Sequence, residues 1–148
     1  MTGGVIIVMV NSRFSVSIHI LSLIASKPSE QISSESIAES VHTNPVVIRR
    51  ICGLLKKRGI LTSRAGISGA TLLVPPSKLS LLDIYLAVQP DNNRLFVIHD
   101  HPNPNCIIGS KIQHTLGKRF SDVQQRLEKE LAQVTLHDVM EDMQLFIS

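Results

Sequence analysis

The segment from Asn44 to Gly59 predicts one helix, with capping residues at both ends and two faces of different chemistry. Asn44 can accept a hydrogen bond at a helix N-terminus, Pro45 has the φ of a first helical residue, and Gly59 suits a C-terminal cap. At about 100° per residue, one arc is apolar and the other cationic. The apolar arc holds Val47, Ile48, Ile51, Cys52, Leu54 and Leu55. The cationic arc holds Val46, Arg49, Arg50, Gly53, Lys56 and Lys57.

Two further helices are expected before Asn44. Ser12 can cap a helix to about Ser26, in which Phe14, Ile18 and Leu21 recur at helical spacing. Residues 1–11 are interpreted as a leader or a poorly ordered segment ahead of this helix, and their apolar run is too short for a membrane span. After a loop, Ser33 or Ser34 opens a short helix through Val41. A tight connection at residues 42–43 then leads to Asn44.

A β-hairpin is predicted after Gly59. One strand is expected within residues 59–63 and a second over residues 70–74, with turn residues around Gly66 between them. Three helices followed by a hairpin is the order of a winged helix-turn-helix domain. Ser80 and Asp83 form a capping box for a helix through Val88. The domain is therefore placed at residues 12–88, followed by a polar loop over 89–108.

One long helix is predicted from about Gly109 to Val134, within a unit spanning residues 109–148. Its apolar residues follow alternating steps of four and three, the pattern of a coiled-coil seam. A helix of this length spans about 35 to 40 Å, which is longer than a small domain can cover. The apolar stripe is therefore expected to pack on a second copy of the chain and form a homodimer interface. The alternative is packing on its own domain. The interface candidates are Leu116, Phe120, Val123, Leu127 and Leu131. Thr135 and Asp138 can cap a final helix.

The charge distribution favours a nucleic-acid partner. Of the 15 Lys and Arg residues, seven lie between Glu39 and Asp83, a stretch that holds no acidic residue. The other end of the chain is richer in Asp and Glu. Aromatic residues make up 3% of the chain, too few for stacking on single-stranded bases. The pattern therefore indicates double-stranded DNA, although a solvated cationic face is the alternative interpretation.

The candidate DNA contacts lie on the cationic arc, at the helix starts and in the hairpin. Backbone N–H groups near Asn44 can seat a phosphate, and an Arg side chain can pair with guanine O6 and N7. Arg64 can reach a phosphate or the minor groove, or serve only as a hairpin-end charge. The candidates are Ser34, Asn44, Val46, Arg49, Arg50, Gly53, Lys56, Lys57, Arg64 and Ser68.

The two cysteines differ in expected role. Cys52 belongs to the apolar arc, where a buried inert thiol is expected. Cys106 follows His99 and His101 in the polar loop, so it is a candidate redox sensor. The spacing matches no zinc signature, and no metal or other cofactor is expected. An enzyme centred on Cys106 is disfavoured, because nothing in the sequence orients a histidine base. No catalytic residue is assigned.

The chain resembles the Rrf2 family of winged helix-turn-helix regulators, to which IscR, NsrR and CymR belong. The resemblance covers nearly everything from Ser12 to Met143. It rests on the stretches 11–14, 43–50, 54–61, 66–70 and 79–85, and residues 103–109 are similar to those of YwnA-type members. It implies dimerisation through the long helix, with recognition helices in successive major grooves and wings over the minor groove. Cluster-binding relatives use three closely spaced cysteines in the loop where this chain has Cys106 alone.

These observations predict a mostly helical protein with a small β-hairpin, a winged helix-turn-helix domain followed by a dimerisation helix. The expected function is a homodimeric, cytoplasmic transcription regulator, most simply a repressor reading a palindromic operator without an iron–sulfur cluster. The alternatives are a protein-interaction adaptor and a thiol sensor acting through Cys106. A small effector or a protein partner is left open, and no membrane partner is expected.

Overall fold

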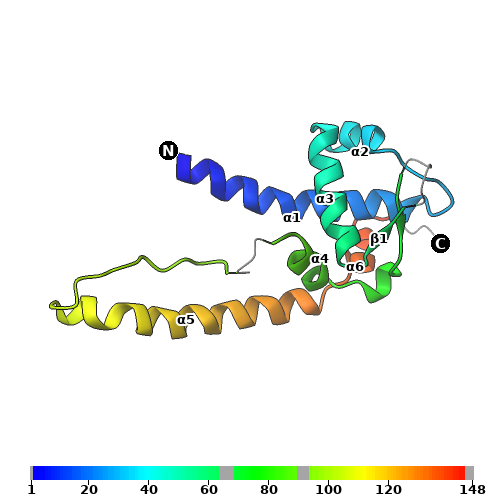
Figure 1. The fold of residues 1–148 in the computed structure, drawn as a ribbon. Helices are drawn as coiled ribbons and strands as arrows, with labels where there is room; N and C mark the ends of the chain where they lie inside the picture. The colour runs from blue at the N-terminus through cyan, green and yellow to red at the C-terminus, as the bar shows by residue number, and fades with distance from the viewer. Residues whose placement is uncertain (1, 64–68, 90–93, 146–148) are drawn as a thin grey trace.

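The computed structural model describes residues 2–63, 69–89 and 94–145 (Figure 1). The elements are α1 (Thr2–Ser26), α2 (Ser34–Val41), α3 (Pro45–Lys57), β1 (Leu61–Thr62), β2 (Thr71–Leu72), the 3-10 helix η1 (Pro76–Lys78), α4 (Leu81–Val88), α5 (Ile107–Ala132) and α6 (Leu136–Asp142). The expected winged helix-turn-helix order with a long helix after it is confirmed. None of the described helices is both long and apolar enough to cross a membrane.

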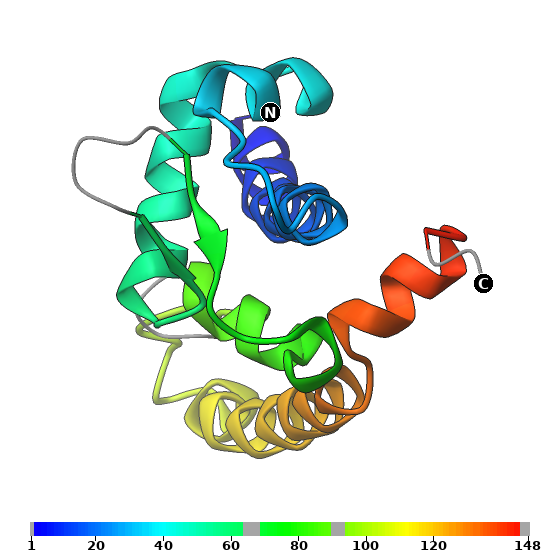
Figure 2. The same cartoon turned by 90° about the vertical axis from the view of Figure 1, so that its right-hand side faces the viewer.

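Helix α1 begins at Thr2 and not at Ser12. Residues 2–11 contain no proline, so the helical backbone hydrogen bonds can continue through them. Ser12, the expected N-terminal cap, lies inside the helix. Figure 2 looks along α1 and shows it in the middle of the domain. It contacts α2, α3, β2, α4 and α6. Residues 2–11 therefore extend the central helix.

The α2–α3 unit has the ends that the sequence predicts. The Ser33 side chain accepts a hydrogen bond from the Ser36 N–H at 3.1 Å, so Ser33 caps α2. His42 ends α2 in the left-handed region, with φ 63°. The Asn44 Oδ1 atom accepts from the Val46 N–H at 2.8 Å, and Pro45 opens α3. Gly59 follows α3 with φ 75°. Local capping thus sets the turn between the two helices.

The hairpin is short and anchored to the core. Leu61 pairs with Leu72 and Thr62 with Thr71 in an antiparallel register. An isolated bridge between Ile32 and Ala70 ties the base of the hairpin to the loop before α2. Arg64, expected at the base of the hairpin, Gly66 in its turn and Ser68 at its tip lie outside the described residues.

Helix α6 returns to the core of the winged domain. Leu136 and Met140 are buried together with Ile20, Leu55 and Ile84. The Leu81 N–H donates to the Val134 carbonyl and the Leu136 N–H donates to the Leu79 carbonyl, each at 2.8 Å. Both expected capping boxes, at Ser80 and Thr135, are present. The sequence places the last helix in a unit with the long helix, but its apolar face packs on α1 and η1.

Helix α5 projects from this domain, with residues 94–106 lying alongside it; we call this segment the strap (Figure 1). No residue of α5 is buried, and within the described part of the chain its main helical neighbour is α4. The Leu95 N–H donates to Gln124 Oε1 at 3.0 Å, and Gln113 Nε2 donates to the His99 carbonyl at 3.1 Å. Residues expected to form only a polar loop therefore cover one side of α5.

Candidate nucleic-acid interface

Helix α3 has the two faces that the sequence predicts, with one correction. Its residues Ile48, Ile51, Cys52 and Leu55 are buried. The predicted cationic arc is exposed to solvent along its whole length: Val46, Arg49, Arg50, Gly53, Lys56 and Lys57. The assignment of Val47 to the core is wrong, because its side chain is 38% exposed. Val47 lies in the first turn of α3, before the helix reaches the core at Ile48.

The N-terminus of α3 is open to solvent next to this cationic face. The Asn44 oxygen is used by the cap, so its amide nitrogen is the atom left to donate to a phosphate. The first backbone N–H groups of a helix have no partner within the helix and carry a partial positive charge. Because no acidic side chain occurs in the first turn of α3, this end can accept an anion.

A notch of about 350 Å³ lies between α2, α3 and the base of the wing. Its rim carries Ser34, Arg49 and Lys56, which the sequence predicts as DNA contacts, and also Glu35, which it does not. Arg49 Nη1 lies 3.4 Å from Glu35 Oε1. Glu35 and Arg49 are separated by 14 residues on different helices, so neither spacing nor periodicity reveals this ion pair.

Gly69 brings the wing base close to the loop before α2. A Cβ atom at Gly69, where φ is 103°, would lie 3.0 Å from both the Gln31 Cβ atom and the Ile32 carbonyl oxygen. A side chain at this position would therefore separate the wing from the loop. Gly69 fixes where the wing leaves the domain, beside the notch.

The two cysteines have different environments. Cys52 is 6% exposed, and burial raises the pKa of its thiol. Cys106 is exposed at the end of the strap, and the backbone N–H groups of Gly109 and Ile108 lower the pKa of its thiol. The described residues contain no cluster of three His, Cys, Asp or Glu side chains that could hold a metal ion.

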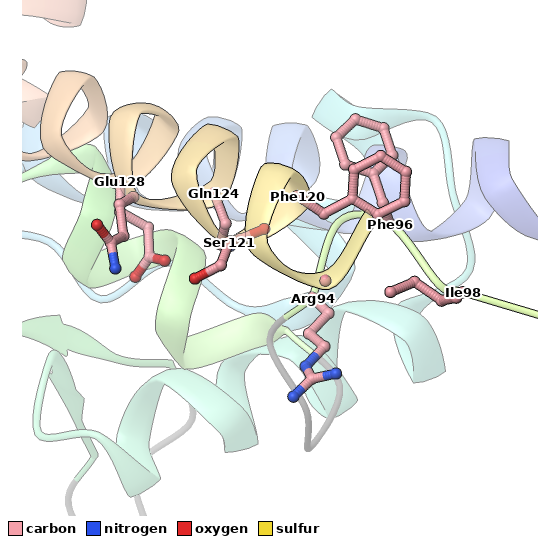
Figure 3. A pocket seen from close by; sticks show the side chains of 9 residues that line it. Arg94, Phe96, Ile98, Phe120, Ser121, Gln124 and Glu128 are labelled. Atoms are coloured by element: carbon pink, nitrogen blue, oxygen red, sulfur yellow. The ribbon is translucent and has the colours of Figure 1, made fainter. Parts of the chain in front are cut away.

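The predicted interface stripe on α5 is partly covered within the chain. Leu116, Phe120, Leu127 and Leu131 are half-buried, whereas Val123 is 45% exposed. The Phe96 ring of the strap lies 5.1 Å from the Phe120 ring, between centroids. The two rings stand at one end of a groove of about 520 Å³, whose other end holds Gln124 and Glu128 (Figure 3).

Over residues 10–142 the sequence matches the Rrf2 family, described as an iron-dependent transcriptional regulator. The chain belongs to the Rrf2 family. YwnA of Bacillus subtilis (strain 168), a proposed HTH-type transcriptional regulator, is 54% identical to this chain over 132 residues. These residues are 89% of this chain and 97% of YwnA. The predicted membership in the family is confirmed.

Solved structures of similar proteins have the same fold. A crystal structure of a proposed DNA-binding protein is 51% identical, with a TM-score of 0.73, over 86% of this chain and 98% of that one. A proposed transcriptional regulator from Lactobacillus plantarum is 27% identical, with a TM-score of 0.77, over 89% of each chain. CymR of Staphylococcus aureus, at 22% identity and a TM-score of 0.62 over 93% of this chain and 98% of CymR, shares the fold.

The family description includes iron dependence, which requires side chains that can bind an iron group. Iron–sulfur clusters are held mainly by cysteine thiolates. Of the two cysteines in the chain, Cys52 lies on the buried face of α3 and Cys106 is exposed at the end of the strap. These two thiols do not form a common ligand set, so the residues do not fit a family-type cluster site.

Proposed function

We propose that this chain is a sequence-specific transcription repressor that binds a palindromic operator as a homodimer, without an iron–sulfur cluster. The observation that carries the proposal is the two-faced α3. Its apolar face is buried in the domain, and the opposite face exposes two Arg and two Lys side chains beside an open helix N-terminus. As a bacterial DNA-binding regulator, the protein would act in the cytoplasm.

In the proposed complex, α3 enters the major groove. Asn44 and the first N–H groups of α3 would hold a phosphate and set the register of the helix. Arg49 and Arg50 would then face base edges, where a guanidinium can donate to guanine O6 and N7 together. Gly53 projects no side chain from the exposed face and would allow close approach. The wing would reach the adjacent minor groove through Arg64 and Ser68.

Dimerisation would use the exposed part of the α5 stripe. A 26-residue helix without a buried residue leaves apolar surface available to a second copy. Val123 is exposed in the middle of the stripe, and Ile107 and Ile108 are 72% and 68% exposed at the start of α5. A two-fold dimer would place its recognition helices about one DNA turn apart, which matches a palindromic site.

DNA binding is tested by fluorescence anisotropy with the region upstream of the protein's own gene and with random DNA of equal length. We expect tighter binding of the upstream DNA and a linear fall of log affinity with log salt concentration. Equal affinity for both at physiological salt would overturn the repressor proposal and favour a protein-interaction adaptor.

Arg50→Ala tests the assigned face. It should weaken operator binding by about 1 to 3 kcal/mol if Arg50 reads a base. The matched control is Lys118→Ala, which removes one positive charge from an exposed position on α5. Similar losses in both variants would mean that net charge, and not the α3 face, determines binding.

A further inference from the structure

Glu35 places a negative charge on the surface proposed to face DNA. It lies in the first turn of α2, and its side chain is 69% exposed. Its carboxylate is 3.4 Å from the Arg49 guanidinium, the side chain of which is 55% exposed. Such an exposed pair contributes little to folding stability. Its position at the rim of the notch instead suggests a role in recognition.

We propose that Glu35 is a specificity-determining residue, which positions Arg49 for a base edge and penalises binding to DNA that lacks this base. The inference rests on the proposed function, and it adds a residue from α2 to the recognition surface of α3. Glu35 acts through Arg49 and is therefore a positioning residue.

The positioning part follows from the geometry of the guanidinium. Arg49 donates to Glu35 through Nη1, so its other N–H groups stay available to a base. An unrestrained Arg side chain samples many rotamers, whereas the ion pair holds its head group over the notch between α2, α3 and the wing base. An Arg restrained in this way loses less conformational entropy when it pairs with guanine.

The penalty follows from charge. Non-specific binding depends on the attraction between cationic side chains and phosphates, and it does not depend on base sequence. A carboxylate on the same surface opposes this attraction at every site. At the operator the base contact of Arg49 offsets the opposition, and elsewhere it does not. Specificity is the difference between these two affinities, so Glu35 raises it by weakening the wrong complexes.

The test compares Glu35→Gln with Glu39→Gln. Both variants remove one negative charge from an exposed position on α2, but no ion pair of Glu39 is found among the described residues. Dissociation constants for operator and random DNA are measured by fluorescence anisotropy at one salt concentration. Glu35→Gln should raise affinity for random DNA about two- to fivefold. The operator-to-random ratio, which is the affinity for operator DNA divided by the affinity for random DNA, should fall by a similar factor. Glu39→Gln should leave the ratio unchanged.

A double-mutant cycle then tests whether Glu35 acts through Arg49. In an Arg49→Ala background, Glu35→Gln should no longer change the operator-to-random ratio. A ratio that changes equally in both backgrounds, or equally in the Glu35 and Glu39 variants, overturns the inference. If the wild-type protein itself shows no preference for the operator, the proposed function fails as well. Circular dichroism melts confirm that each variant is folded.

Discussion

The backbone carbonyl of Asn103 occupies the space that a Cβ atom would need at Gly109, in the first turn of α5. The turn that brings this carbonyl there is closed by two hydrogen bonds. The Cys106 N–H donates to the Asn103 carbonyl at 3.2 Å, and the Asn105 N–H donates to Asn103 Oδ1 at 3.0 Å. The end of the strap can therefore pack against the first turn of α5 because residue 109 has no side chain.

Gly109→Ala should destabilise the protein. The Asn103 carbonyl belongs to the backbone, so the turn must move to admit a methyl group, at a cost of about 1 to 3 kcal/mol. Urea denaturation gives the change in the free energy of unfolding. The matched control is Gly117→Ala in the same helix, where the new Cβ would lie 3.9 Å from Ile98 Cδ1. It should stabilise the protein by about 0.5 to 1 kcal/mol. Stabilisation by both would show that Asn103 does not constrain residue 109.

The parts of the fold that the sequence predicts depend on contacts between near neighbours in the chain. Asn44 and Ser80 cap helices by hydrogen bonds to backbone groups two or three residues away. Such caps depend on a few side-chain types at fixed spacing. The burial of Ile48, Ile51 and Leu55 follows from helical periodicity, which is again a local property.

The features that the sequence does not predict depend on distant partners. Phe96 meets Phe120, and Leu95 meets Gln124 across 29 residues, so no local pattern shows that the strap lies on α5. The Glu35–Arg49 pair depends in the same way on the angle between α2 and α3. Val47 falls on the apolar arc of α3, but periodicity does not show where along a helix the core begins.

Substitutions at Asn44 should separate helix capping from DNA binding. Asn44→Ala removes the acceptor for the Val46 N–H and should lower stability by about 1 kcal/mol. Asn44→Asp retains a good cap acceptor, so stability should stay close to that of the wild type. Its negative charge would, however, repel a phosphate at the N-terminus of α3. Urea denaturation and operator binding are measured together. Wild-type operator affinity in the Asp variant would contradict the phosphate contact.

Val123→Glu should dissociate the proposed dimer. Val123 is 45% exposed in the single chain, so the charge can be accommodated in a folded monomer. In a dimer that buries the stripe, an unpaired carboxylate would raise the dissociation constant by about two orders of magnitude or more. Sedimentation velocity gives the oligomeric state. The control is His114→Glu, at an exposed position outside the stripe. An intact dimer in the Val123 variant would place the interface elsewhere.

The two thiols should react at different rates and with different pH dependence. Only the thiolate attacks iodoacetamide, and the N–H groups of Gly109 and Ile108 favour the thiolate of Cys106 by lowering its pKa. The alkylation rate of Cys106 in the folded protein should therefore reach its plateau at a lower pH than in urea. Cys52 is buried and its thiol pKa is raised, so it should react only after unfolding. Mass spectrometry distinguishes the two sites, and Cys106→Ser should remove labelling of the folded protein. Identical pH profiles in the presence and absence of urea would show that the N-terminus of α5 does not activate Cys106, and would remove the physical basis for a thiol sensor at this position.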